Sequence, residues 1–577
     1  MILLRSRACS LHAAALACAG LGFSSSVLAQ ANPSTPPSFV EEQRRQERER
    51  ALREQQARSV DARVEAPAPP PAALLPQGEA PCFRIDRIVL AGDRAEDFQW
   101  ALDGLSGPGG DDSPIGRCFG TEGVNVVLSR AQQAVIERGY VTTRVLAGAQ
   151  DLTQGTLTLS LIPGRIAAIR MAADNPADTS LRGAIPARPG DLLNIRAIEQ
   201  GLENLKRVPT AEADIQIEPS TAPDARPGDS DLVVRYSRAM PLRTTLSLDD
   251  GGTDATGRLQ AGLTLAWDNP LGLNDLFYAS LNHDAFNHGG QGTDGRTVHY
   301  SMPFGDWLLS ATASRSDYHQ TVAGYVENYV YAGESDNAEL RLSRLLYRDQ
   351  KRKTTLAVRG WRRASRNYID DTEIDVQQRR VGGWELGLNH REFIGAATLD
   401  ANLAYRRGTG AFGSIPAPEE IDGDGTSRMQ LWSADAALNL PFELGGQRLR
   451  YSGLWRAQWN RTPLTPQDRF SIGGRYTVRG FDGESSLLGE RGWLLRNDIG
   501  WALGASGAEL YAGLDYGQVS GPSTRWLVGR QLAGAVLGLR GAWRGLNYDF
   551  FVGTPISKPE GFQTSRLSAG FSLNLSF

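Results

Sequence analysis

The 577-residue sequence is poor in cysteine, histidine and lysine, and it lacks long hydrophobic runs. Four cysteines, six histidines and four lysines stand beside 57 arginines. The formal net charge is −4, and removal of Arg5 and Arg7 with an N-terminal signal lowers it by two, to −6. A negative chain of this kind argues against nucleic acid as a partner.

The hydrophobic residues are too dispersed for membrane-spanning helices. Beyond the N-terminal signal, no segment has the uninterrupted run of about 18 apolar residues that a transmembrane helix needs. With 22% charged residues, 64 glycines and a mean hydropathy of −0.33, the chain is also too polar for a helical membrane protein, and it is too long for one compact domain. A membrane β-barrel remains compatible, because only every second strand residue must face lipid.

Motifs of catalysis and metal binding are missing as well. The sequence has no GxSxG elbow and no phosphate-binding glycine loop, and no histidine accompanies a nucleophile in an activating motif. His283, Asp284 and His288 lie close together, but adjacent strand residues point to opposite faces, which favours surface positions over a metal site.

Two carboxylate pairs, Asp249-Asp250 and Asp370-Asp371, stand beside turn residues. We expect them in solvated loops rather than as an acid/base couple. The sequence therefore predicts a protein that is not an enzyme and that needs no cofactor and no metal.

The N-terminus has the features of an export signal over residues 1–29. Arg5 and Arg7 precede an apolar segment, and Val27-Leu28-Ala29 offers small residues for cleavage before Gln30. Cleavage would remove Cys9 and Cys18. The remaining cysteines, Cys82 and Cys118, would meet in an oxidising compartment, so we predict a disulfide, with two buried free thiols as the alternative.

Residues 30–80 predict a helix followed by a linker. Phe39 to Val60 contains no glycine or proline and many strong helix formers, and pairs such as Glu49 with Arg53 have the favourable i,i+4 order. No apolar stripe is present, so this helix must lie in water or in a polar cavity. Five prolines between Asp61 and Ala80 predict an extended linker.

Two small α/β units follow, at residues 81–164 and 165–240. In the first, strand patterns at Phe83–Leu90, Val141–Leu146 and Leu157–Ile162 accompany a helical pattern at Val124–Val135. The second repeats this organisation over a similar length, which is typical of tandem domains. Neither unit contains a catalytic grouping, and their strand edges could pair with an extended client peptide.

Residues 241–577 have the pattern of a membrane β-barrel. At roughly 20 residues per strand and connection, about 335 residues predict an even number of strands near 16. The last strand is the clearest, because its apolar residues alternate with small polar ones. The apolar positions are Leu567, Ala569, Phe571, Leu573, Leu575 and Phe577.

A long loop interrupts the strand pattern at Phe470–Glu484, FSIGGRYTVRGFDGE. Turn-forming glycine, serine and aspartate residues surround the short β-prone core Tyr476-Thr477-Val478, and Arg479 follows at the tip. Alternating apolar residues on both sides place this loop between two barrel strands. The alternating set after the loop is Trp493, Leu495, Ile499 and Trp501.

The loop motif Val478-Arg479-Gly480-Phe481 resembles the VRG(F/Y) tip of the loop that folds into the pore of two-partner secretion outer-membrane transporters. These form the haemolysin secretion/activation family, within the superfamily of POTRA-containing outer-membrane assembly proteins. The resemblance extends over nearly the whole mature chain. Its further segments are Gly139–Val145, Asp151–Ile166, Ile198–Pro209, Gly228–Arg238 and Trp267–Asp275.

The resemblance implies a fold of a plug helix in the barrel lumen, two POTRA domains and a barrel of 16 strands. It also implies a partner for Arg479, because the run Gly513-Leu514-Asp515-Tyr516-Gly517 resembles the family's second barrel motif, whose aspartate pairs with the loop arginine. Strand parity independently points Asp515 into the lumen, and Gly513 and Gly517 leave room for another backbone. The terminal Phe577 resembles the recognition signal for outer-membrane insertion.

The function implied is type V secretion, with a barrel in the outer membrane and POTRA domains in the periplasm. The POTRA domains would recognise a partner exoprotein by its N-terminal secretion domain, and the barrel would export it unfolded and without ATP. The exoprotein would resemble an adhesin or haemolysin, and a haemolysin would also be activated. The other partners would be outer-membrane lipid and the barrel-assembly machinery.

Two alternatives compete with this interpretation. A barrel-assembly factor of the same superfamily would share the loop motif, but it should carry more POTRA modules and lack the plug helix. A general porin would need no POTRA modules at all.

Overall fold

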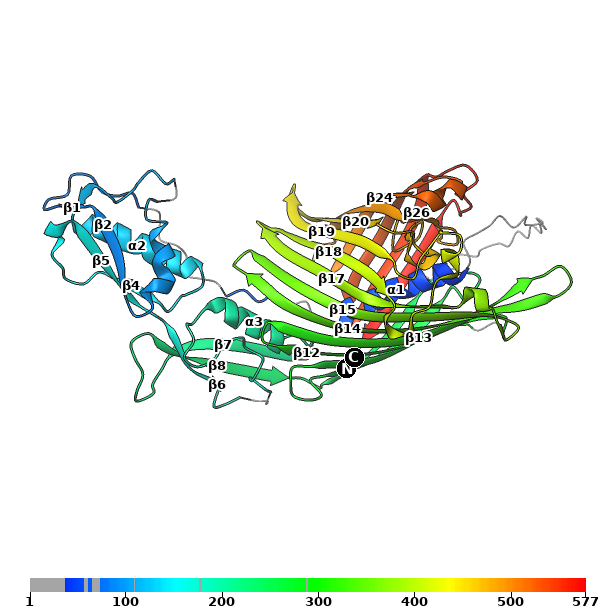
Figure 1. Ribbon diagram of the computed structural model, residues 1–577, viewed down its shortest axis with the longest axis horizontal. Coiled ribbons are helices and arrows are strands. Elements are labelled where there is room, and N and C mark those ends of the chain that lie inside the picture. Colours follow the sequence, from blue (N-terminus) through cyan, green and yellow to red (C-terminus); the bar gives the residue numbers. More distant parts are fainter. Residues whose placement is uncertain (1–36, 57–60, 65–72, 108, 176–178, 287–288) are drawn as a thin grey trace, which may run out of the picture. The chain divides into compact units, whose positions relative to one another are not determined.

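The computed structural model describes residues 37–56, 61–64, 73–107, 109–175, 179–286 and 289–577 (Figure 1). The predicted signal at 1–29, with Cys9 and Cys18, lies outside the described residues. So do residues 57–60, the end of the predicted plug helix, and His288 of the candidate histidine group. Among the described residues no helix is both long and apolar enough to cross a membrane.

The first element is the helix α1 (Pro37–Gln56). It begins two residues before the predicted start. Its sequence carries charge on every side, so burial of an apolar face cannot position it. Side-chain contacts with the barrel do so instead, as described below.

The first α/β unit combines a two-stranded ribbon with a three-stranded sheet. β1 (Phe83–Ile85) pairs with β3 (Arg117–Phe119), and the sheet has the order β2-β5-β4. The other elements are β2 (Arg87–Gly92), α2 (Thr121–Glu137), β4 (Arg144–Leu146) and β5 (Thr156–Ile162). The strand expected over Phe83–Leu90 is therefore divided at Asp86 between two sheets.

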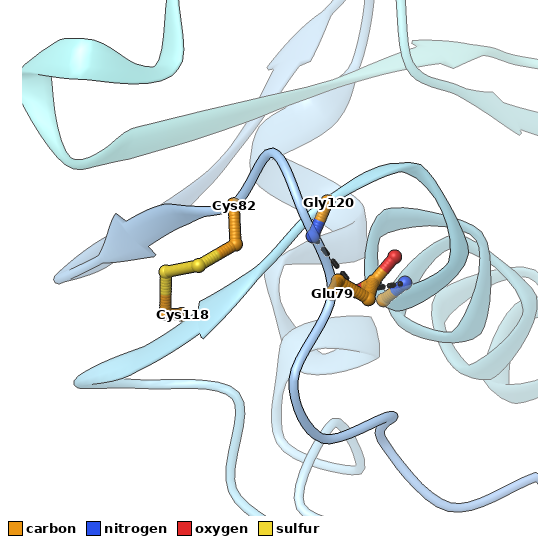
Figure 2. Close-up of a disulfide and its surroundings, with 5 residues drawn as sticks. Glu79, Cys82, Cys118 and Gly120 are labelled. Carbon is orange, nitrogen blue, oxygen red and sulfur yellow. Dashed lines mark hydrogen bonds between the residues drawn. A yellow bond between two sulfur atoms is a disulfide. The ribbon is translucent and has the colours of Figure 1, made fainter.

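A disulfide joins Cys82 to Cys118 beside this ribbon, with 5.4 Å between their Cα atoms (Figure 2). Glu79 lies next to it and accepts hydrogen bonds from the backbone N–H groups of Gly120 (2.7 Å), Glu122 (2.9 Å) and Gly123 (3.1 Å). These are free donors of the first turn of α2, and a carboxylate is favourable there. Desolvation raises the pKa of Glu79, but the three donors outweigh it and lower the pKa overall.

We expect the Cys82–Cys118 disulfide to stabilise this unit substantially. Closing a loop across a sequence separation of 36 contributes about 4 kcal/mol in the chain-entropy estimate. The mature protein, denatured without reductant, should bind no thiol reagent, and it should bind two equivalents after reduction. Labelling of both cysteines before reduction would contradict the pairing.

The end of the linker packs on this unit instead of spanning freely to it. Leu75 is buried in the same hydrophobic core as Ile85 and Val127, and its N–H donates to Asp112 at 2.9 Å. Arg130 and Arg117 also bind the Asp112 carboxylate. Desolvation raises the pKa of Asp112, but these donors lower it to about 2 overall. The tether between α1 and the first unit is therefore fixed at this end.

The second α/β unit has a three-stranded sheet of order β6-β8-β7 with one long helix. Its elements are β6 (Arg165–Met171), α3 (Ile195–Leu205), β7 (Ala211–Pro219) and β8 (Asp229–Arg238). Ile195, Ile198 and Leu205 of α3 are buried against the sheet, as their helical spacing predicts.

The rest of the chain forms a closed antiparallel barrel (Figure 1). In the described part of the chain, 16 long strands make up its wall, and the two-residue β16 (Thr372–Glu373) adds to the turn after β15. The long strands are β9 (Leu242–Asp249), β10 (Gln260–Asp268), β11 (Leu276–Asp284), β12 (Gln291–Phe304), β13 (Trp307–Ala323), β14 (Asn328–Arg348), β15 (Arg352–Ile369), β17 (Arg379–Ile394), β18 (Ala397–Thr409), β19 (Gln430–Leu444), β20 (Gln447–Asn460), β23 (Arg491–Ala502), β24 (Ala508–Ser520), β25 (Gln531–Trp543), β26 (Leu546–Ser557) and β27 (Ser568–Ser576).

The first and last strands close the barrel. β27 pairs with β9 over Ser572–Ser576, and the terminal Phe577 continues the pairing with a backbone hydrogen bond to Thr244 (2.9 Å). The Phe577 side chain is exposed. The seam between β9 and β27 has five register pairs among the described residues, whereas β13 and β14 share 17.

Candidate functional site

The loop Phe470–Glu484 folds against the inside of the barrel wall. It lies between β20 and β23, and a short ribbon of β21 (Phe470–Ile472) and β22 (Leu487–Gly489) closes its base. Val478 and Phe481 are buried in a cluster with side chains of β23, β24 and β25. Phe481 also meets Phe562 edge to face, with ring centroids 5.8 Å apart. The loop is therefore held by packing on both sides of its arginine.

Arg479, at the tip, binds two carboxylates from neighbouring strands. Its Nε and Nη2 donate to Asp515 of β24 at 2.7 and 2.8 Å, and its backbone N–H donates to the same carboxylate at 2.9 Å. Its Nη2 and Nη1 donate to Asp498 of β23 at 2.5 and 3.2 Å. The Arg479 side chain is 5% exposed. Charge-assisted bonds in such a buried site are strong, and the planar guanidinium suits them.

The sequence pointed to Asp515 but not to Asp498. The alternation of β23 could have indicated Asp498, because the apolar residues Trp493, Leu495, Ile499 and Trp501 all lie on one face of the strand. The opposite parity places Asp498 on the inner face, directly across from Gly513 of β24.

Glycines make the space that this arrangement needs. A Cβ on Gly513 would lie 2.7 Å from Nη2 of Arg479, and a Cβ on Gly517 would lie 2.7 Å from a methyl group of Val478. Gly480 has a φ of +97°, and a Cβ there would lie 2.5 Å from the carbonyl oxygen of Thr554. Larger residues at these positions would push the loop from the wall.

A second loop arginine, Arg475, binds residues where the first and last barrel strands, β9 and β27, meet. Its Nη1 donates to Asp250 at 2.9 Å and its Nη2 donates to the carbonyl oxygen of Phe571 at 3.1 Å. Asp250 also accepts the N–H of Phe571 at 2.8 Å. The expectation of a solvated loop is therefore wrong for Asp249, which is the last residue of β9, and for Asp250, which an arginine 225 residues away covers. Asp370 and Asp371 do lie in an exposed turn.

The helix α1 lies against the inner wall and shares its contacts between loop and strands. Arg44 donates to the carbonyl oxygen of Gly483 in the loop (2.5 Å), and Glu47 accepts from Arg456 of β20 (2.6 Å). At the other end, Arg243 of β9 donates to the Gln56 side chain (3.0 Å). A cavity of about 390 Å³ lies between the helix and the wall. Its lining includes Glu49 of the helix, Arg479 of the loop and side chains of the strands. The lumen therefore contains the helix and the loop together.

The charges of α1 pair differently from the sequence prediction. Glu49 pairs with Arg45 within the helix, whereas Arg53 binds Glu339 of β14. The strands thus supply partners that no helical spacing predicts.

His283 and Asp284 are the described members of the candidate histidine group. Among the described residues, no three histidine, cysteine or carboxylate side chains are grouped as metal ligands. His283 contacts the carbonyl oxygen of its neighbour Asp284, at 2.6 Å.

Comparison with known proteins assigns the chain to a family. The family described as haemolysin secretion/activation protein ShlB/FhaC/HecB matches residues 228–541. This chain belongs to that family. A ShlB-type POTRA domain matches residues 83–164, and a second POTRA domain matches residues 165–219. The two α/β units are thus POTRA domains, referred to below as POTRA 1 and POTRA 2.

Individual members of the ShlB/FhaC/HecB family align over most of the chain. Outer membrane transporter CdiB-2 of Burkholderia pseudomallei (strain 1026b) is 38% identical, and the match covers 93% of each chain. Hemolysin transporter protein ShlB of Serratia marcescens is 27% identical over 78% of each chain. The solved structure of CdiB from Acinetobacter baumannii is 30% identical, with a TM-score of 0.81 over 94% of this chain and 98% of that one.

Family membership and fold together fix the location of the ShlB/FhaC/HecB-type chain. The barrel lies in the outer membrane, and the POTRA domains lie in the periplasm. Turns that contact POTRA 2, such as the one at Asn269–Asn274, are therefore periplasmic, and the loop Phe470–Glu484 enters from the extracellular side.

Proposed function

We propose that the protein exports one large partner exoprotein, unfolded and without ATP, through its barrel. The observation that carries the proposal is a lumen filled by two elements, α1 and the arginine loop, held by side-chain contacts. Such contacts can be exchanged without unfolding the barrel. A passive pore for small solutes would gain nothing from them.

POTRA 1 and POTRA 2 support recognition of the partner in the periplasm. Their sheets have edge strands, such as β7, that can accept an extended peptide. Relatives carry names such as hemolysin transporter, so the partner here is of the adhesin or haemolysin class. A barrel-assembly factor is disfavoured by the presence of α1 in the lumen, and a porin by the POTRA domains. Export itself needs no catalytic group, so we infer that the protein is not an enzyme.

The residues divide these tasks. Val478, Arg479, Gly480 and Phe481 form the pore-loop motif, which Gly513, Asp515 and Gly517 anchor to the wall. The Cys82–Cys118 disulfide stabilises POTRA 1. Phe577 serves as the insertion signal that the barrel-assembly machinery recognises, and lipid surrounds the finished barrel.

The test is export of a large exoprotein with an N-terminal secretion domain, to be sought in the neighbouring gene and produced with the transporter in a host that lacks both. The exoprotein should reach the medium, and deletion of residues 83–238 should stop it while the barrel still inserts. Equal amounts in the medium without the POTRA domains would contradict the proposal. Enhanced uptake of small solutes without any export would favour a porin.

A further inference from the structure

A buried charge cluster holds the tether of α1 between POTRA 2 and the barrel. Residues 61–64 come after the plug helix, and both the barrel and POTRA 2 contact them. On the barrel side, Arg391 of β17 binds Asp61 at 2.8 Å, and the Arg63 guanidinium lies 3.4 Å above the Phe393 ring. On the POTRA side, Glu199 of α3 accepts the N–H of Val64 at 3.0 Å.

Arg348, at the periplasmic end of β14, connects the two sides. It donates to Glu199 (2.9 Å) and Glu203 (2.9 Å) of α3 and to the carbonyl oxygen of Ala62 (2.6 Å). Lys353 of β15 also binds Glu203. The side chains of Glu199 and Arg348 are 1% and 7% exposed. POTRA 2, the barrel and the tether therefore share one guanidinium.

Burial makes this arrangement sensitive to the loss of either partner. A buried charge that loses its counterion is strongly destabilising, whereas an exposed pair contributes little. Displacement of α3 by even a few ångströms would remove Glu199 from Arg348 and from Val64 together. The tether would then keep only its barrel contacts, which are the partly exposed Asp61–Arg391 pair, the Arg63–Phe393 contact and the Ala62 carbonyl on an Arg348 that has lost its carboxylates.

The segment between α1 and residues 61–64 is too short to let α1 leave the lumen by itself. The helix has 20 residues, so withdrawal over its whole length requires about 30 Å of travel. Gln56 and Asp61 are separated by four residues, and five residue steps reach at most about 18 Å. The helix cannot leave the lumen toward the periplasm while residues 61–64 stay in place.

We infer that Glu199 and Arg348 are positioning residues that retain the plug helix and release it when POTRA 2 moves. The inference rests on the proposed function, in which α1 closes the pore. It assigns the trigger to α3, so a partner exoprotein that shifts POTRA 2 would free the helix without touching it.

Single-channel recording in planar bilayers tests the inference with the full-length protein. Glu199→Gln and, from the barrel side, Arg348→Gln should each raise the ratio of open to closed time at least about tenfold. The matched control is Glu218→Gln, the same change in the same domain. Glu218 pairs with Arg170 at the exposed surface and should leave the ratio unchanged. Heat-dependent gel mobility identifies variants whose barrels are folded.

Deletion of residues 37–56 separates this inference from the proposed function. If the deletion opens the pore but both glutamine variants stay closed, the retaining role of Glu199 and Arg348 is refuted, while the role of α1 as a plug stands. If the deletion itself leaves the pore closed, the plug role fails. In the deletion background, Glu199→Gln should have no further effect, and an equal gain there would place its action in the barrel and overturn the inference.

Discussion

Arg479→Ala should reduce export of the partner to background while leaving the barrel inserted and folded. The change removes a guanidinium that is buried between Asp498 and Asp515 and leaves these carboxylates only the more distant Arg540 (3.6 Å) and Arg496 (3.8 Å). Breaking a buried ion pair by removing one partner costs about 3–5 kcal/mol, enough to detach a loop that a few contacts hold. Arg479→Lys should be nearly as damaging, because an ammonium cannot bind two carboxylates as a planar fork does. Secreted and cell-bound exoprotein would be measured by immunoblot.

The matched control is Arg461→Ala, an exposed arginine of the same connection between β20 and β23. It should export at the normal level. Asp515→Asn should be worse than Asp498→Asn, because Asp515 also accepts the Arg479 backbone N–H. Wild-type export by Arg479→Ala would refute the role of the loop. If exchanging the charges of Arg479 and Asp515 rescues neither single reversal, the pairing itself would be left unsupported.

Deletion of residues 37–56 should enlarge the single-channel conductance and leave secretion largely intact. The helix occupies the lumen beside the arginine loop, so its removal empties most of the path while the recognition domains remain. Planar-bilayer conductance and entry of a large antibiotic would both rise. Secretion should persist because the partner must displace the helix in any case.

The control replaces α1 by a glycine-serine segment of equal length, which keeps the tether but removes the side-chain contacts. It should behave like the deletion. Unchanged conductance in both variants would mean that the helix is only a solvated tail.

The alternation of residues along a strand indicates which side chains face the lumen and where one strand ends. In β24 it placed Asp515 inside, and the structure shows Asp515 buried while Leu514 is exposed. The same parity divides the segment Phe83–Leu90, because Phe83 and Ile85 are odd-numbered and Ile88 and Leu90 are even-numbered. That change marks the break at Asp86 between two sheets.

The contacts of the lumen were beyond sequence patterns for a physical reason. Asp250 meets Arg475, and Arg53 meets Glu339, across 225 and 286 residues. Local periodicity reports which face a side chain occupies, but it does not report which distant charge shares that face. The charged surface of α1 predicted polar surroundings and left the partners undetermined. The tether was missed likewise, because its partners Glu199 and Arg348 lie far along the chain.

The contacts of Arg475 set an order on the folding of the barrel. Asp250 and Phe571, which hold this arginine, come from the two ends of the barrel sequence and are 321 residues apart. They come together only when β9 pairs with β27. The loop therefore cannot dock fully when only the strands next to it in the sequence have formed. Contacts of such high sequence separation form late. A barrel that fails to close would keep an unpaired guanidinium inside it, and ring closure and loop docking therefore become one cooperative step.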